Sequence, residues 1–290
     1  MKKIKLKISI ETDFNSKNIK NYLAENLKKI FSANISCRDF ENINVNLNTN
    51  TSKNDFVFII SHLDKTFAQY FNFNNTTELN MKKLNYEIDV FSKKIIQFSK
   101  ENKQVFFFMW PLDINDNYMG NLNFKRGHKS WLINYINLRI SEQLSSEKNL
   151  NLIDTNFLVL KHEAAIKIYD EKTKYLTNNY YSLDMIRLLS NHINYLIEDH
   201  YNPKKIKLII LDLDNTLWGG EAGEKKYNEL EIGPNSIKGN IFQQFQKRLK
   251  AVKKYGVILA ISSKNYEKNA LNVFKKNKNM ILKIKDFASV

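Results

Sequence analysis

Short, wholly apolar segments alternate along the chain with longer segments whose apolar residues recur every three or four positions. Phe56–Ile60 and Val105–Trp110 are of the first kind, and the segment that carries Leu84, Ile88 and Phe91 is of the second. A continuous apolar run is typical of a strand buried on both faces of a parallel sheet. The wider spacing is that of an amphipathic helix. Strands that alternate with helices predict an α/β fold with right-handed crossovers.

The same two patterns recur elsewhere in the sequence. We expect further strands over residues 4–10, 43–47 and 206–211, and further helices over residues 19–30, 131–144 and 183–197. A polar segment ending in Pro203, one of three prolines, precedes the strand at 206–211. The length of 290 residues suits two domains, each with its own core. The sequence therefore predicts domains over 1–203 and 204–290.

Composition excludes several classes of protein. The net charge is +15, but the basic residues are almost all lysines spread along the chain, without the arginine-rich and aromatic clusters of nucleic-acid binders, so we expect no nucleic-acid partner. The single cysteine, Cys37, excludes a disulfide framework and a cysteine-based zinc site. No apolar run reaches the roughly 18–20 residues of a membrane helix, and no signal-cleavage site follows the N-terminus. We expect a cytoplasmic protein with no membrane partner.

The strand predicted over 206–211 runs directly into Asp212-Leu213-Asp214-Asn215-Thr216. Ligands bind at the carboxyl ends of strands in open α/β sheets, and residues two apart in extended chain project to one side. Asp212 and Asp214 can then face one site, where two close carboxylates stay ionised only beside a cation, and oxygen ligands favour Mg²⁺. One carboxylate can attack a phosphoryl group while the other moves a proton. The alternative is that the acidic pair caps the next helix.

The segment Leu208–Gly220 resembles motif I of the haloacid dehalogenase-like (HAD) phosphohydrolases. Its ending, Trp218-Gly219-Gly220, is similar to the FkbH-like branch of phosphatase subclass IIIC. The similarity continues, in order, through residues 230–234, 242–246, 256–265, 280–283 and 286–288. It spans about residues 204–290 and implies a partial HAD Rossmann-like domain with a parallel sheet.

The resemblance implies a role for each matching position. Asp212 is expected to be the nucleophile that forms an aspartyl-phosphate and Asp214 the acid/base, with Asp212 and the Asp214 carbonyl on the Mg²⁺. Ser263 is expected to hold a phosphoryl oxygen, although its position equally suits a helix N-cap. The other positions expected to bind substrate are Thr216, Lys264 and Asn265.

Two departures from the family pattern bear on activity. A motif III lysine and a motif IV acidic pair are absent from these 290 residues, so we expect this form to be inactive or weakly active. The strand before Asp212 should also keep an open edge. Ser262 stands where relatives often carry a cysteine. The glyceryl transfer to an acyl carrier protein that the branch is associated with needs a thiol for a thioester, and only Cys37 supplies one.

The first domain is expected to be a three-layer domain similar to the SGNH hydrolases, which the resemblance implies for FkbH-like proteins. The first strand ends in Glu11-Thr12-Asp13 without the Gly-Asp-Ser that this fold uses for catalysis. His62 and His192 are not placed like triad members, and a lone histidine is more often packed than catalytic. We therefore expect a non-catalytic domain that binds substrate or a partner.

These observations predict a HAD-type, Mg²⁺-dependent phosphohydrolase or phospho-acyl (glyceryl) transferase acting on a small phosphorylated metabolite, with an acyl carrier protein as a further partner. The alternative is a non-catalytic interaction module that docks a carrier protein or a biosynthetic partner. A third reading, an SGNH-type esterase, predicts covalent labelling of a serine by a fluorophosphonate.

Overall fold

The chain forms two compact units, Met1–Asn202 and Pro203–Val290, in a computed structural model. The structure describes residues 3–39, 42–48, 53–71, 79–112, 125–162, 166–177, 179–201 and 206–289. The predicted domain boundary at residues 203 and 204 lies outside the described residues. Among the helices that are described, none is long and apolar enough to cross a membrane.

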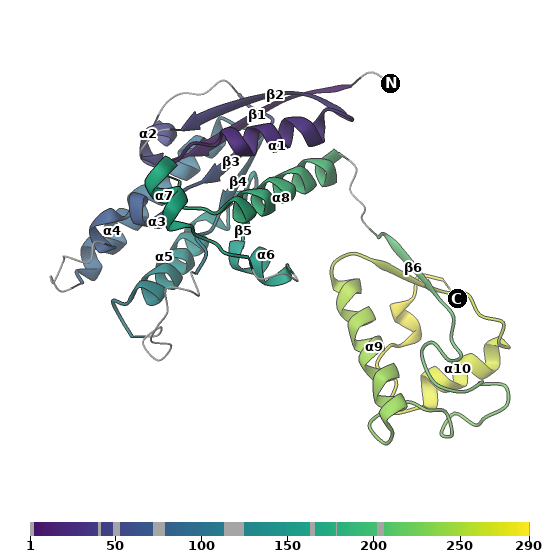
Figure 1. Cartoon of the computed structure of the whole chain (residues 1–290). Coiled ribbons are helices and arrows are strands. Elements are labelled where there is room, and N and C mark those ends of the chain that lie inside the picture. The colour runs from purple at the N-terminus through teal and green to yellow at the C-terminus, as the bar shows by residue number, and fades with distance from the viewer. Residues whose placement is uncertain are drawn as a thin grey trace. The chain divides into compact units, whose positions relative to one another are not determined.

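A five-stranded parallel sheet forms the middle of the N-terminal unit (Figure 1). Its strands run in the order β2-β1-β3-β4-β5. They are β1 (Ile4–Thr12), β2 (Phe31–Asp39), β3 (Phe56–Ile60), β4 (Gln104–Phe108) and β5 (Leu150–Ile153). This is the order of a doubly wound sheet, in which the chain leaves the centre in both directions.

Helices cover both faces of this sheet, because successive side chains of the buried strands point to opposite sides. Phe56 and Phe58 face one core, and Val57 and Ile59 face the other. The first core is covered by α1 (Lys17–Leu27) and α8 (Leu183–Tyr201), and the second by α2 (Ile43–Asn48), α4 (Met81–Lys100) and α5 (Lys129–Leu144). The N-terminal unit therefore has the three layers predicted for it.

Among the described residues of this unit, the remaining helices are short. They are α3 (Leu63–Thr66), the 3₁₀ helix η1 (Ala68–Tyr70), α6 (Thr155–Lys161) and α7 (Glu171–Thr177). Side-chain caps fix the start of two helices of the unit: Asn80 Oδ1 accepts from the Lys83 amide at 3.1 Å, and Asp154 Oδ1 accepts from the Phe157 amide at 3.0 Å.

The strand predicted over 43–47 is wrong, because this segment is the helix α2. Alternate apolar positions fit a strand, but residues 43 and 47 are also one helical turn apart. Ile43 and Leu47 are buried, while Val45 is 46% exposed. Asn42 starts the helix, since its Oδ1 accepts from the Asn44 amide at 2.9 Å. The second strand is instead β2, which the sequence analysis did not predict.

The C-terminal unit has a small parallel sheet of β6 (Leu208–Leu211) and β7 (Ile258–Ile261). Ser289 adds a parallel bridge to Ala260, on β7. The helices of the unit are α9 (Ile237–Lys254), α10 (Glu267–Lys276) and the 3₁₀ helix η4 (Ile284–Asp286). Trp218 is fully buried in the core between them. The α/β fold with parallel sheets predicted from the sequence is thus confirmed.

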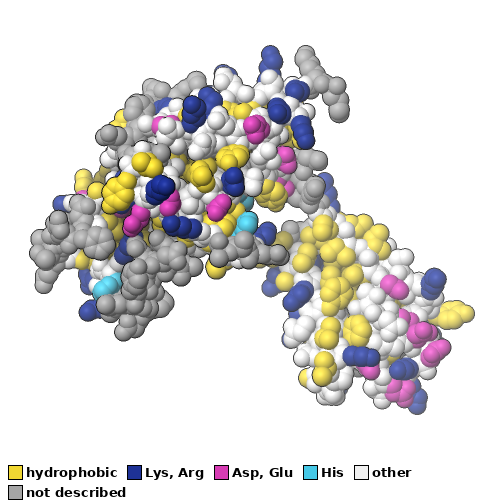
Figure 2. Space-filling model, in the orientation of Figure 1, with side chains coloured by type: hydrophobic (Ala, Val, Ile, Leu, Met, Phe, Trp, Pro, Cys, Tyr) yellow, Lys and Arg dark blue, Asp and Glu magenta, His cyan; other side chains and the backbone are white. Residues whose placement is uncertain are grey.

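In the described part of the chain, one face of this small sheet is largely exposed. Leu208 pairs with Ile258 across the sheet, so these two side chains and Ile210 project to the same side. They are 47%, 50% and 61% exposed, respectively. Figure 2 shows hydrophobic side chains gathered on the surface of this unit. Parallel sheets are normally covered on both faces, which makes this apolar surface unusual.

Candidate functional site

The predicted site residues follow the carboxyl ends of β6 and β7. Leu211 pairs with Ile261, and the Ser262 amide donates to the Leu211 carbonyl at 2.9 Å. Asp212 and Ser262 therefore leave the sheet side by side, since neighbouring strands lie about 4.8 Å apart. This register places the two polar segments that the sequence singled out at one edge of the sheet.

A tight turn holds Asp214 after the strand. Asp214 Oδ1 accepts hydrogen bonds from Trp218 Nε1 at 2.8 Å and from the Ala222 amide at 3.1 Å. Asn215 takes a left-handed conformation with φ 53°, and its Oδ1 accepts from the Gly220 amide at 2.9 Å. Asparagine adopts this conformation more readily than most residues. Asp214 thus stabilises its own turn, and it does not cap α9, whose N-cap is Ser236.

Asp212 and Thr216 lie in the same turn as Asp214. Asp212 is exposed, and its Oδ1 accepts from the Leu213 amide at 2.7 Å. The Thr216 amide donates to the Leu213 carbonyl at 3.2 Å. The turn therefore leaves the Asp212 carboxylate facing solvent, where an incoming ligand can reach it.

The residues after β7 form a second loop. Ser263 Oγ accepts from the Asn265 amide at 3.3 Å. The alternative role of Ser263 as a helix N-cap is wrong, because α10 begins at Glu267 with Tyr266 as its N-cap. Asn265 Nδ2 is buried and has no hydrogen-bond partner within the described part of the chain. Lys264, between them, is exposed.

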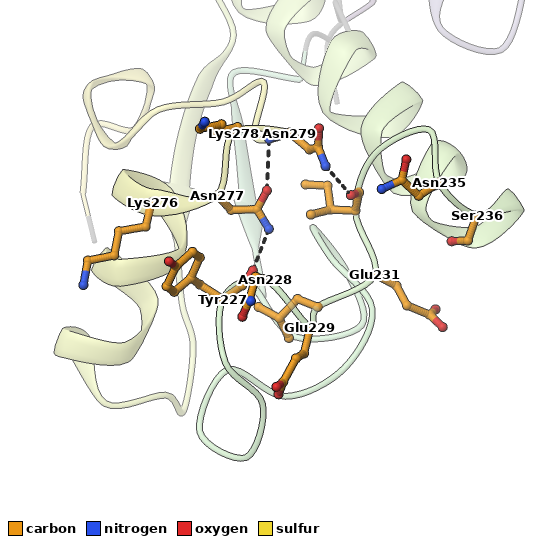
Figure 3. Close-up of a pocket in the computed structure, with 12 residues that line it drawn as sticks. Tyr227, Asn228, Glu229, Glu231, Asn235, Ser236, Lys276, Asn277, Lys278 and Asn279 are labelled. Carbon is orange, nitrogen blue, oxygen red and sulfur yellow. Dashed lines mark hydrogen bonds between the residues drawn. The ribbon is translucent and has the colours of Figure 1, made fainter.

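A cavity of about 440 Å³ lies elsewhere in the C-terminal unit (Figure 3). None of the six predicted site residues lines it. Its asparagines bond to backbone: Asn277 Nδ2 donates to the Tyr227 carbonyl at 2.7 Å, and Asn279 Nδ2 to the Ile232 carbonyl at 3.0 Å. These amides fasten the loop before α9 to the end of α10, which is a structural role.

The N-terminal unit contains a buried pair of Asp and His that the sequence analysis missed. His62 contacts Asp13, and both side chains are buried. Asp13 directly follows β1 and His62 lies two residues after β3, a signal that was visible in the sequence, but their contact depends on the strand order. His192, by contrast, packs edge-on against Phe108, and burial, followed by the charge of Lys161, lowers its pKa.

The donors at the β6 end suit a hard cation. Within the described ranges, no group of three or more His, Cys, Asp or Glu side chains could hold a metal ion. Asp212 and Asp214 thus offer at most two carboxylates. Mg²⁺ is bound in this way in proteins, by one or two carboxylates, with water and substrate phosphate completing its shell.

Comparisons with known proteins identify a similar fold. No protein-family model and no curated protein matches the chain. The N-terminal part of the protein BF1531 from Bacteroides fragilis, which contains a phosphatase domain and was crystallised with Mg, aligns with a TM-score of 0.71 at 22% identity. The alignment covers 99% of this chain and 76% of that chain. At this identity the likeness shows a shared fold.

A second solved structure is much less similar. LAE5, an α/β hydrolase from the metagenome of Lake Arreo in Spain, aligns with a TM-score of 0.42 at 7% identity. That alignment covers 68% of this chain and 95% of the other. A likeness at this level carries no argument about this chain.

Proposed function

We propose that the C-terminal unit is a HAD-type, Mg²⁺-dependent phosphohydrolase that acts on a small phosphorylated metabolite. The observation that carries the proposal is the shared strand end at which Asp212, Asp214 and the Ser263–Asn265 loop emerge from paired strands. The phosphatase domain in the similar structure from Bacteroides fragilis, crystallised with Mg, supports it. The FkbH-like branch is part of the same proposal and rests on the sequence motif.

In the proposed reaction, Asp212 is the nucleophile. A carboxylate oxygen of Asp212 forms a bond to phosphorus, the bond from phosphorus to the leaving oxygen breaks, and that oxygen takes a proton from Asp214. Both hydrogen bonds to Asp214 end on Oδ1, so Oδ2 is the oxygen that can carry the proton. Water then attacks the aspartyl-phosphate, returns a proton to Asp214 and releases phosphate.

The neighbouring donors would orient the phosphoryl group. Asn265 Nδ2 is a buried donor without a partner in the described part of the chain, and such a group is costly until an acceptor binds it. A phosphoryl oxygen is such an acceptor, and Ser263 Oγ and Lys264 lie in the same loop. Mg²⁺ held by the Asp212 carboxylate and the Asp214 backbone carbonyl would supply charge stabilisation for the phosphoryl oxygens.

Glyceryl transfer to an acyl carrier protein is the finer form of this proposal. A thioester on the enzyme needs a thiolate, and burial raises the pKa of the Cys37 thiol, which disfavours the thiolate. Cys37 also lies on β2, in the other unit. Phosphoryl transfer through Asp212 needs no thiol, so it is the first reaction to test.

The test uses the full 290-residue chain, Mg²⁺ and labelled acetyl phosphate as a small phosphoryl donor. Because the sequence predicts weak activity at best for this form, we expect slow, partial labelling by a covalently bound phosphoryl group, which hydroxylamine removes as it does an acyl phosphate. Asp212→Asn should abolish the label, and Glu267→Gln, which changes an exposed carboxylate on α10, should keep it. The alternative, a non-catalytic module that docks a carrier protein or a biosynthetic partner, predicts no label on a folded chain that still binds Mg²⁺.

A further inference from the structure

Asp13 and His62 lie where a doubly wound sheet forms a crevice. Asp13 directly follows the end of β1, and His62 follows Ser61 at the end of β3, the neighbouring strand. From β1 the chain continues through α1, on one face of the sheet, and from β3 it continues to α4, on the other. In a sheet of order 2-1-3-4-5, this switch between β1 and β3 opens a crevice at the carboxyl ends of the strands, and ligands bind there.

The two side chains form an oriented pair. Asp13 Oδ2 accepts from the His62 amide at 2.8 Å, and Asp13 Oδ1 lies 2.8 Å from His62 Nδ1. Each residue is 1% exposed. Lys65 Nζ donates to the Asp13 carbonyl at 2.7 Å. A carboxylate only accepts, so the hydrogen between the two groups lies on Nδ1, and in the neutral form of the imidazole the lone pair is then on Nε2.

His62 Nε2 is buried and has no hydrogen-bond partner among the residues that the structure describes. Aromatic rings surround the imidazole: the ring centroids of Phe14, Tyr180 and Tyr181 lie 5.0, 4.6 and 4.5 Å from that of His62. An acceptor left unpaired in such surroundings is unfavourable, so it needs an explanation beyond packing. A ligand that donates a hydrogen bond to Nε2 provides one.

A cavity of about 120 Å³ lies next to the pair. Leu63 and Asp64, which directly follow His62, line it together with Tyr180, whose half-buried ring contacts the imidazole. Other walls are the rings of Phe71 and Tyr169. His62 itself does not line the cavity, so a contact between a ligand and Nε2 requires the Tyr180 side chain to turn away from the imidazole.

The cavity selects for size and hydroxyl groups rather than for net charge. Carboxylates at Asp64, Asp170 and Glu171 share its wall with the ammonium groups of Lys129 and Lys174. Carboxylates accept hydrogen bonds from hydroxyl groups, and aromatic faces pack against the carbon atoms of a ligand. The volume suits a small ligand, such as a polyol of about three or four carbons.

We propose that Asp13 and His62 form a second site, at which Nε2 of His62 accepts a hydrogen bond from a hydroxyl group of a short neutral polyol that packs against Tyr180. Asp13 is a positioning residue, because it fixes the tautomer of His62. The site belongs to the N-terminal unit and is independent of the phosphohydrolase proposed for Asp212.

The test is nitrogen-15 NMR of the histidine side chains in the full chain, with polyols of two to five carbons added as probes. Of the five histidines, we expect His62, assigned with His62→Gln, to be protonated on Nδ1 only. Its Nε2 resonance should shift saturably with polyols of about three or four carbons. His192→Gln and Asp212→Asn, which change neither the pair nor the cavity, should leave this shift unchanged.

Two variants separate this role from a merely structural one. In Asp13→Asn, the amide can accept from the His62 backbone and donate to Nδ1, which moves the ring proton to Nε2 and should weaken polyol binding roughly tenfold. Tyr180→Leu leaves the buried pair intact and should weaken binding as well. The proposal is wrong if no polyol shifts the Nε2 resonance in the folded chain, or if Asp13→Asn binds polyol as tightly as the parent.

Discussion

The indole Nε1–H of Trp218 donates a hydrogen bond of 2.8 Å to Oδ1 of Asp214, four residues earlier in the chain. Trp218 is fully buried and its ring packs edge-on against Phe274 of α10. The tryptophan therefore connects the carboxylate to the hydrophobic core. The direction of Asp214 is set by core packing as well as by its own turn.

Replacing Trp218 with phenylalanine should loosen Asp214. Trp218→Phe keeps an aromatic ring in the core but removes the indole donor, while the Ala222 amide still binds Asp214. We expect the free energy of unfolding of the C-terminal unit to fall by about 1–3 kcal/mol, as for a hydrogen bond to a charged group plus some lost packing. Urea unfolding measures this loss.

A double-mutant cycle with Asp214→Asn tests the contact itself. Because the two residues touch, the losses from the two single variants should not add, with a coupling energy of about 1 kcal/mol. Trp131→Phe, which alters a tryptophan stacked on Tyr135 in the N-terminal unit, is the matched control and should show no coupling. Strictly additive losses for Trp218 and Asp214 would contradict the contact.

Gln246 connects the segment after α10 to the turn that contains Leu217. Its replacement should be among the most destabilising substitutions in this unit. The side chain is fully buried; its Nε2 donates to the Leu217 carbonyl at 2.7 Å, and its Oε1 accepts from the amides of Ile281 and Leu282 at 3.0 and 3.1 Å. Gln246→Leu keeps the side-chain volume but leaves three backbone groups without their hydrogen-bond partner. We expect a loss of about 3 kcal/mol or more in urea unfolding.

Gln244 provides the comparison for Gln246, since it lies two residues away on the same helix. It is exposed, and its amide makes one long hydrogen bond of 3.4 Å to Asn240. Gln244→Leu should change the free energy of unfolding by less than about 0.5 kcal/mol. Equal losses of unfolding free energy for the two substitutions would mean that the buried amide does not hold the segment after α10.

The sequence predicts an element well where its hydrophobic pattern has one interpretation. The continuous apolar run of β3 fits only a buried segment, and the long period of α4 fits only a helix. The pattern of residues 43–47 fits a strand and a helix equally well, and capping by Asn42 favours the helix. The edge strand β2 mixes buried and exposed positions without a clean alternation, so its pairing with β1 is what reveals it.

In the candidate sites too, some features could be predicted from the sequence and others depend on the fold. The position of Asp212 was predictable because a polar residue directly after an apolar strand lies at the ligand-binding edge of a parallel sheet. The contact of Trp218 with Asp214 was not, since it depends on the left-handed conformation of Asn215. Asp13 and His62 are 49 residues apart, and only the adjacency of β1 and β3 brings them together.

Acid should weaken the C-terminal unit through Asp286. Burial raises the pKa of this carboxyl group, but hydrogen bonds from the Lys283 amide at 2.8 Å and Lys253 Nζ at 3.1 Å outweigh it, so the pKa is lower than the ordinary 3.8. The unfolded chain then binds the proton more tightly than the folded one. The stabilisation by Asp286 is complete above the unfolded pKa and is lost as the pH falls through the folded pKa.

Asp286→Asn isolates this contribution. We expect the variant to be less stable than the parent by about 1 kcal/mol near neutral pH, and the difference to shrink as the pH falls below 3.8. Urea unfolding at a series of pH values measures it. Glu224→Gln, at an exposed carboxylate of the same unit, should show no such pH dependence. A difference that stays constant down to the lowest pH would contradict the linkage.

The exposed face of the small sheet should drive self-association. In the described part of the chain β6 pairs only with β7, and an edge strand with exposed apolar side chains invites pairing with another molecule. Ile210→Lys places a charge on this face. Because Ile210 is already 61% exposed, the free energy of unfolding should change by less than about 0.5 kcal/mol, while sedimentation velocity should show fewer oligomers.

Leu211 is the matched position, one residue along the strand and on the opposite face. It is 5% exposed within the core, so Leu211→Lys buries an unpaired charge and should destabilise the unit by about 4 kcal/mol or more. The contrast depends on the two faces of β6 being different. If Ile210→Lys destabilised the protein as much as Leu211→Lys, the outer face of β6 would have to be covered in the native protein.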